Sequence, residues 1–378
     1  MKIKYIIIGL VALAFISGCS KSRTEAQHAV DDEAWVNDES LPVPVTFSAP
    51  GVEIESKALI TVTATTEDMH FGVYGLATTY DEPSSSHNPA WWDDQPDTKL
   101  MENVKAVGGS EFKFKQDDWS NDLTVYYPMG SEKTFSFYAY YPYGNAEYSG
   151  NCFSVTYDLR EVPDVMWAES HAVALDAQYG TEDRLGFNAA YIRRVKRSTG
   201  GEDKLPKLDF THKLAALQFN AVTSDGSESS NYTITGLELV DISQTATLVI
   251  ASNGNYSGAT QAGEVRGGAW GPIPLLNSEG LSEFEVVPNA TGNEIGTMVI
   301  VPVAAGTAMK ANVSIKLGDQ EPNTQEVTFS APSGGFKAGY RYVINVKVLS
   351  GEEVSIFATS VKEWNDNTPA IDIDEPIG

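Results

Sequence analysis

The feature that most constrains the fold is a series of short runs of β-branched and aromatic residues between Val43 and Val361. Many of these runs alternate with polar residues, and Gly, Pro, Asn, Asp or Ser separates one from the next, as is typical of strands joined by turns. The clearest runs are residues 45–48, 59–65, 71–79, 111–116, 134–142, 217–222, 245–251, 297–303, 311–317, 340–348 and 354–361. No window of twelve residues has a clear helical stripe, although residues 164–178 and 182–197 are compatible with short helices or irregular segments. The sequence therefore predicts an all-β chain built from β-sandwiches.

The length of the chain sets the number of domains to expect. At about 150 residues per domain, 378 residues favour two domains after removal of a leader. The stretch Arg193–Pro206 combines charged residues, two glycines and a proline, which is typical of a linker. We therefore predict one β-sandwich over residues 43–200, a second over residues 201–365, and an acidic tail over residues 366–378.

The first 18 residues have the organisation of an export signal. Lys2 and Lys4 precede an apolar run over residues 5–16, which is too short to be a permanent membrane helix. The run ends at Gly18-Cys19, which resembles the lipobox of bacterial lipoproteins; the alternative is a chance cysteine near a cleavage site. We expect removal of residues 1–18, a covalent lipid such as palmitate on Cys19 as the only attached group, and a flexible acidic tether over residues 19–42.

Charge and cysteine content narrow the range of partners. The chain has 26 Lys and Arg against 51 Asp and Glu, for a net charge of -25, and such a surface repels nucleic acid. Cys19 and Cys152 are the only cysteines. If Cys19 is acylated, Cys152 has no partner for an intramolecular disulfide and is predicted to be a buried thiol. We expect no nucleic-acid partner and a fold stabilised by its apolar core.

Sequence patterns that carry catalysis are missing. The chain has no H-E-x-x-H, paired C-x-x-C, G-x-S-x-G or phosphate-binding glycine loop, and its five histidines are scattered. The acidic pairs Asp93-Asp94 and Asp117-Asp118 leave a glycosidase as one hypothesis. Adjacent residues on a strand point to opposite faces, however, which favours exposed loops for both pairs. We predict no enzymatic activity, no metal and no cofactor.

Trp91 and Trp92, in the sequence NPAWWDDQP, are the candidate residues for stacking on a sugar. The alternative is that one indole plugs the end of a sandwich while the other covers a turn, because indoles have large areas to bury. A monomeric, glycan-binding surface lipoprotein is therefore a second functional hypothesis.

A series of motifs in a fixed order carries a family resemblance. The series is the lipobox, VTFSA, ESKALITVTATT, FGVYGLATT, LMENVKAV, DWSNDLTVYYPMGSEKTFSFYAYYPYG, DVMWAES, THKLAALQF and VSIFATSVKEWND. In this order the motifs resemble the fimbrillin-like family, the type V pilins and related lipoproteins of the Bacteroidetes; the aromatic segment Asp118–Gly144 is the most specific part. The resemblance implies two tandem transthyretin-like β-sandwich domains, a lipid anchor in the outer membrane, and a place at the cell surface as a stalk, tip or anchor subunit of a fimbria.

The resemblance also implies a maturation step. In the pilin branch, a trypsin-like protease cuts after a basic residue and removes the leader together with the first strand, and a strand from a neighbouring subunit fills the groove. By position Lys57 matches the cleavage residue, which would make Ala58 the new N-terminus; the alternative is an ordinary loop lysine. The implied partners are other fimbrial subunits or further copies of this chain, with host or bacterial surface ligands for an adhesive member. Val354–Val361 is the candidate donor strand, and His212 matches a recurrent family histidine with an expected structural role.

Overall fold

The computed structural model describes residues 33–47, 69–81, 86–108, 112–130, 132–162, 164–173, 186–224, 226, 231–254, 261–349, 353–363 and 371–372. The strands are β1 His70–Asp81, β2 Ser86–Pro89, β3 Lys99–Val107, β4 Lys113–Lys115, β5 Thr134–Tyr141, β6 Glu147–Ser149, β7 Cys152–Asp158, β8 Met166–Ser170, β9 Thr211–His212, β10 Ala215–Thr223, β11 Tyr232–Ser252, β12 Val265–Pro274, β13 Asn293–Ile300, β14 Ala308–Leu317, β15 Asn323–Ser330, β16 Tyr340–Val348, β17 Val354–Glu363 and β18 Ile371–Asp372. The helical elements are α2 Ala34–Asn37, η2 Pro96–Thr98, α3 Ala189–Arg197 and η4 Glu202–Lys204. The predicted all-β class is confirmed. None of the helices in these ranges is long and apolar enough to cross a bilayer.

The described strands form three sheets. Sheet A has the order β4-β3-β1-β5-β8-β9, with β2 on β1. Sheet B has the order β15-β14-β11-β7-β6, with β12 on β11, and sheet C has the order β13-β10-β16-β17-β18. The pair β10 and β16 is parallel, whereas the neighbours in sheets A and B are antiparallel.

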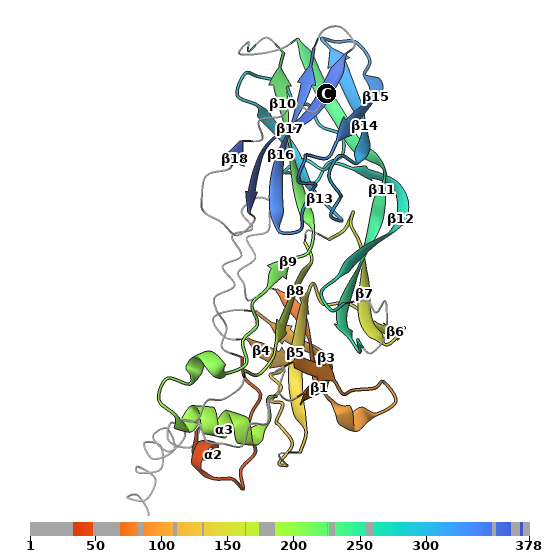
Figure 1. Ribbon diagram of the computed structural model, residues 1–378. Helices are drawn as coiled ribbons and strands as arrows, with labels where there is room; N and C mark the ends of the chain where they lie inside the picture. The colour runs from red at the N-terminus through yellow and green to blue at the C-terminus, as the bar shows by residue number, and fades with distance from the viewer. Residues whose placement is uncertain are drawn as a thin grey trace, which may run out of the picture.

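The long strand β11 connects distant parts of the chain. Its first half pairs with β14 and its second half with β7, while β12 follows the other edge. Figure 1 shows β11 and β12 running from the upper part of the molecule, which holds β14, down to the part that holds β7. The register shifts next to Asp241, whose φ of 54° is left-handed, as expected where a bulge bends a strand. Sheet B thus draws strands from both sides of residue 200, and the domain boundary there stays a prediction.

Strand β12 is missing from the predicted strands because its composition is typical of a loop. It contains Gly267 and, further on, Pro272 and Pro274. Proline is tolerated in a sheet only where its missing N–H faces no partner, and β12 is an edge strand that pairs with β11 alone. A Cβ at Gly267 would lie 2.7 Å from Oγ of Ser243, so the glycine allows β12 to lie close to β11.

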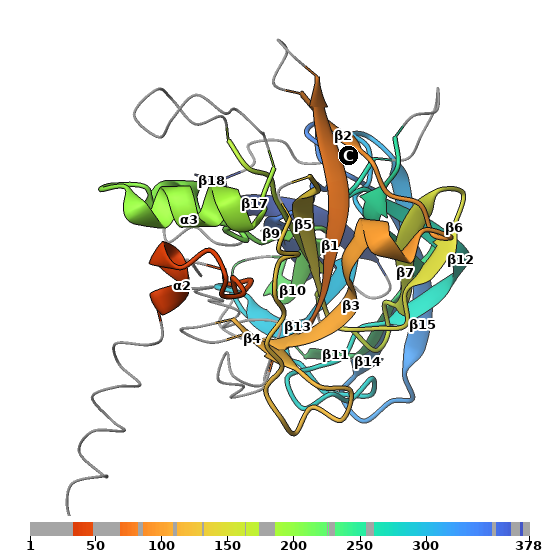
Figure 2. The ribbon, with the colours of Figure 1, turned by 90° about the horizontal axis from the view of Figure 1, so that it is seen from below.

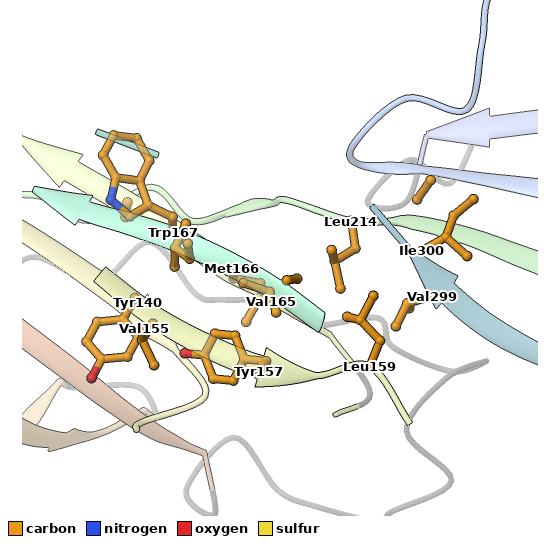
Figure 3. Packing of buried hydrophobic residues seen from close by; sticks show 14 of the residues in the cluster. Tyr140, Val155, Tyr157, Leu159, Val165, Met166, Trp167, Leu214, Val299 and Ile300 are labelled. Carbon is orange, nitrogen blue, oxygen red and sulfur yellow. The ribbon is translucent and has the colours of Figure 1, made fainter. Parts of the chain in front are cut away.

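The apolar core continues from sheets A and B into sheet C. Figure 3 shows Leu159 and Val165 between Tyr157 on one side and Leu214 and Val299 on the other. All five side chains are buried. Their burial makes the junction between the sheets part of the hydrophobic core rather than a hydrated interface.

The segment Arg193–Pro206 corrects one interpretation, since its first part is helix α3 rather than an interdomain linker. The side chain of Asn188 caps the helix by accepting a hydrogen bond from the Tyr191 N–H at 2.8 Å. Ile192 and Val195 are buried on one face. The sequence left residues 182–197 open between a short helix and an irregular segment, because nine residues are few for a periodic pattern and basic residues interrupt the apolar ones.

Candidate functional site

Other parts of the chain pack against both faces of sheet A. The residues of β5 from Thr134 to Tyr140 are all buried, as expected of a strand with a continuous apolar run. Tyr74 packs against Phe153 of β7, with ring centroids 4.7 Å apart, on one face. Phe137 points to the other face, where Phe187 packs on it at 5.8 Å. This second face is where the N-terminal part of the chain lies.

Residues Val43–Phe47, which we call the N-terminal segment, fill a groove on this second face. Val43, Val45 and Phe47 are 0%, 3% and 8% exposed, whereas Thr46 between the last two is exposed. The ring of Phe47 meets that of Phe137 edge to face at 5.0 Å, and it also contacts Phe112 and Phe114. A period of two with one face inward is the pattern of a strand laid onto an apolar surface.

Two backbone hydrogen bonds pair the N-terminal segment with the chain around Tyr126. The N–H of Val45 donates to the carbonyl of Val125 at 2.8 Å, and the N–H of Tyr127 donates to the carbonyl of Val43 at 2.9 Å. Pro44 and Tyr126 form the antiparallel bridge between these bonds. Main-chain pairing combined with pockets for alternate side chains is the recognition mode of strand addition.

The groove is costly to leave empty. Burial of Val43, Val45 and Phe47 contributes roughly 1.5–3 kcal/mol each as an upper estimate. Removal of the segment would expose this apolar surface and leave the Val125 carbonyl and the Tyr127 N–H without these partners. The site is thus built for an extended segment with apolar side chains at alternate positions, as Val43, Val45 and Phe47 provide.

Helix α3 holds the chain that leads into the groove. Arg193 donates from Nε to the carbonyl of Trp35 at 2.8 Å and from Nη2 to the carbonyl of Leu41. Arg197 donates from Nε to the carbonyl of Val36 at 2.7 Å. Figures 1 and 2 show α2 and α3 side by side, next to sheet A. Sequence reasoning assigned these arginines to a linker. The available signal for another role was the concentration of four cationic residues on one short stretch of an acidic chain.

Three residues of the predicted sites lie outside the described residues. They are the lipidation residue Cys19, with the signal peptide 1–18 before it, and the cleavage pair Lys57 and Ala58. The described chain stops at Phe47 and resumes at Met69, on either side of this pair. Their roles stay predictions.

Trp91 and Trp92 have different environments. Trp91 is 1% exposed, its ring stacks on Phe153 with centroids 5.2 Å apart, and its carbonyl accepts a hydrogen bond from Asn253 Nδ2 at 2.8 Å. It therefore has no open ring face for a sugar, which corrects the sugar-stacking hypothesis for this residue. Trp92 is half-buried, and its backbone N–H donates to Thr98 Oγ1 at 3.3 Å. A sugar contact of the Trp92 ring therefore stays a prediction.

The acidic pairs lie on exposed loops. Asp93 makes an ion pair with Lys99 at 3.1 Å. Asp118 accepts a hydrogen bond from the Ser120 N–H at 3.0 Å, and its hydrogen bonds with Ser120 lower the pKa of its carboxyl below the usual range. A glycosidase needs a general acid whose pKa is raised, so Asp118 does not have the property of that acid. Within the described ranges, no group of His, Cys, Asp and Glu side chains is arranged to hold a metal ion.

His212 and Cys152, for which the sequence predicts structural roles, are both buried. Nδ1 of His212 lies 2.5 Å from Oδ2 of Asp164, and both side chains are buried. The Cys152 thiol is also buried and donates to Ser252 Oγ at 3.3 Å. These contacts join neighbouring segments of the sheets, in keeping with the expected structural roles.

Comparisons with known proteins place the chain in a family. A sequence model of the family described as fimbrillin-like matches residues 57–364, and a comparison with curated proteins finds no match. Similar solved structures include a protein described as a cell adhesion protein from Bacteroides uniformis, with 17% identity, 85% of this chain and 99% of that chain covered, and a TM-score of 0.46. A fimbrial protein from Bacteroides vulgatus has 14% identity, 85% and 99% coverage, and a TM-score of 0.47. Because the family match spans most of its length, the protein belongs to the fimbrillin-like family.

Proposed function

We propose that this protein is a structural or adhesive subunit of surface fimbriae, in which the N-terminal segment occupies the place of a strand that a neighbouring subunit later donates. The observation that carries the proposal is the burial of Val43, Val45 and Phe47, with Phe47 packed on Phe137 of sheet A, together with the backbone hydrogen bonds that join the N-terminal segment to Val125 and Tyr127. Membership of the fimbrillin-like family supports a fimbrial or adhesive role. The subunit takes the position of a stalk, tip or anchor.

The proposed sequence of events begins with export and attachment of the chain to the outer membrane through a lipid on Cys19. A protease then cuts after Lys57, and residues up to Lys57 leave the subunit, including the N-terminal segment. The residues matched by the family model begin at Lys57, which supports a mature chain that starts near this point. The emptied groove accepts a strand from another subunit because its apolar surface and its free backbone groups are then satisfied again.

The identity of the donor strand is a separate question. Val354–Val361, the predicted donor, lies within β17, which pairs with β16 along its length and also contacts β18. Donation of β17 would remove this strand from the interior of sheet C. We therefore do not assign the donor to β17.

A disulfide that locks the N-terminal segment in place tests the proposal. Pro44 and Tyr126 face each other as an antiparallel bridge without mutual hydrogen bonds, and the Cα atoms of such pairs lie about 4.5 Å apart, within the range for a disulfide. Cells producing the Pro44→Cys/Tyr126→Cys variant should lack surface polymers, and reductant should restore them. The two single variants are the controls. Normal polymers from the oxidised double variant would show that the groove is not used for assembly.

A further inference from the structure

The charges of α3 and of residues 19–57, which we call the leader below, are complementary. Between Thr24 and Ser56 the chain has eight Asp and Glu residues and no Lys or Arg. Helix α3 carries Arg193, Arg194, Lys196 and Arg197, in a chain with 26 Lys and Arg in total. The most basic short stretch of this acidic protein thus lies against its acidic N-terminal part.

The contacts between them are centred on a buried guanidinium. Arg193 is 5% exposed. Besides Trp35 and Leu41, its side chain donates to the carbonyls of Asp38 at 3.4 Å and Glu39 at 3.5 Å. A buried guanidinium has five N–H donors and no acceptor. The leader residues 35–41 supply these acceptors as backbone carbonyls. Recognition by Arg193 therefore depends on the backbone conformation of the leader and not on its side chains.

Exposed ion pairs and a polar hollow surround this centre. Lys196 lies 3.3 Å from Glu33, and Arg197 lies 3.8 Å from Glu39. A hollow of about 480 Å³ lies between the leader and the helix, and its lining includes Glu39, Arg193 and Arg197. Exposed pairs of this kind contribute little each, so Arg193 is the main attachment.

We infer that α3 is a binding surface for the leader residues Trp35–Leu41, and that it keeps the N-terminal segment in its groove after the chain has been cut. The inference rests on the proposed cleavage at Lys57, which lies C-terminal to both the α3 contacts and the groove contacts. Neither set of contacts depends on an intact peptide bond at Lys57. Cleavage alone therefore leaves the groove filled, and the incoming strand has to displace the leader.

This arrangement regulates assembly at the same groove. A subunit with an empty groove would expose apolar surface and unpaired backbone groups, which favours aggregation. Retention of the cut leader delays that exposure until a donor strand competes for the groove. The α3 arginines then set how fast exchange occurs.

The test uses the full-length chain in detergent, with the recognition sequence of a site-specific protease inserted between Lys57 and Ala58. After cleavage in vitro, size-exclusion chromatography with mass spectrometry measures how long the leader fragment stays bound. The parent chain should retain the fragment. Arg193→Met should release it at least about tenfold faster, because charge-assisted hydrogen bonds from a buried group are lost.

Two further variants complete the design. Arg197→Met should increase the release rate by about twofold to fivefold, as expected for a half-exposed contact. Arg160→Met, which removes an exposed guanidinium paired with Asp158, is the matched control and should not change the rate. If Arg193→Met fails to fold, as judged by near-ultraviolet circular dichroism, Arg197→Met and the parent chain decide the result.

Immediate loss of the fragment from the parent would overturn the inference, as would equal retention by the parent and a folded Arg193→Met variant. Because the cut is engineered, the outcome does not depend on whether Lys57 is cleaved in cells. If Lys57 is not cleaved in cells, the proposed function is contradicted, but the retention of the fragment measured after the engineered cut is unaffected. The two proposals can therefore fail separately.

Discussion

At the scale of single residues, burial decides what Trp91 and Trp92 contribute. The two indoles are adjacent in sequence, yet Trp91 packs against Phe153 and Tyr148 while Trp92 remains half-buried. From the sequence alone, both residues were equally good candidates for stacking on a sugar, since an indole ring is found both in cores and at binding surfaces. Trp91 is buried because β7, which carries Phe153, packs over it, and β7 lies about 60 residues later in the chain.

The difference between the two tryptophans is measurable. We expect Trp91→Ala to lower the free energy of unfolding by about 3–5 kcal/mol, because it leaves a large cavity in the core. Trp92→Ala should lower it by about 1 kcal/mol or less. Urea denaturation of both variants gives the values. Equal losses would contradict the packing described for Trp91.

The pair of His212 and Asp164 supports a second prediction. Asp164→Ala should lower the free energy of unfolding by about 2–3 kcal/mol, because it removes the buried carboxyl group whose Oδ2 lies 2.5 Å from Nδ1 of His212. The control is Asp209→Ala, which removes an exposed partner of Lys207 and should cost about 1 kcal/mol or less. Similar denaturation midpoints for the two variants would show that the buried pair does not stabilise the fold.

At the scale of elements, the N-terminal segment offers a direct test of its alternation. Phe47→Ala should lower the free energy of unfolding by about 3–5 kcal/mol, since the ring lies among Phe112, Phe114 and Phe137. The neighbouring exposed position Thr46→Ala should change it by no more than about 0.5 kcal/mol. Chemical denaturation of the uncut chain measures both. A cost at Thr46 as large as that at Phe47 would place the wrong face of the segment in the groove.

Strands were predictable where their side chains alone reveal burial. The runs at residues 71–79 and 134–142 coincide with β1 and β5, and residues 340–348 coincide with β16, because alternating or continuous apolar residues carry a local signal. The edge strand β12 carries no such signal, as its glycines and prolines are tolerated only through its position on β11. The burial of Arg193 on α3 could not be predicted for a related reason, because its hydrogen-bond partner Trp35 lies more than 150 residues earlier in the chain.

At the scale of the whole molecule, buried tyrosines make the fold sensitive to alkaline pH. Burial raises the pKa of the phenols of Tyr74, Tyr127, Tyr140 and Tyr157 above the ordinary value of 10.0. Their stabilising effect is fully present below pH 10, and it is lost as the pH rises further, because the unfolded chain then releases these protons and the folded chain does not. Each tyrosine should cost the fold about 1.4 kcal/mol per pH unit above 10.

Thermal unfolding monitored across the alkaline range, together with tyrosinate absorbance, tests this prediction. The melting temperature should fall steeply above pH 10, and the absorbance of these four residues should appear only on unfolding. Gradual ionisation of all tyrosines in the folded protein would contradict their burial.

Part of the arrangement at the groove could be predicted from the sequence. The family resemblance placed a removable first strand ahead of Lys57, and the structure has an alternately buried segment at Val43–Phe47. The identity of the surface that holds this segment depends on contacts between residues 33–47, the loop around Val125 and α3. These contacts arise only in three dimensions, so the sequence could not supply them.

The native N-terminus of the protein tests the central claim most directly. Mass spectrometry of the outer-membrane fraction and of material sheared from the cell surface would identify it in each. We predict a chain that begins at Ala58 in the sheared fraction, because the N-terminal segment must leave the groove before another subunit's strand can enter. A chain that retains an acylated Cys19 and occurs only in the membrane fraction would contradict strand exchange at this groove.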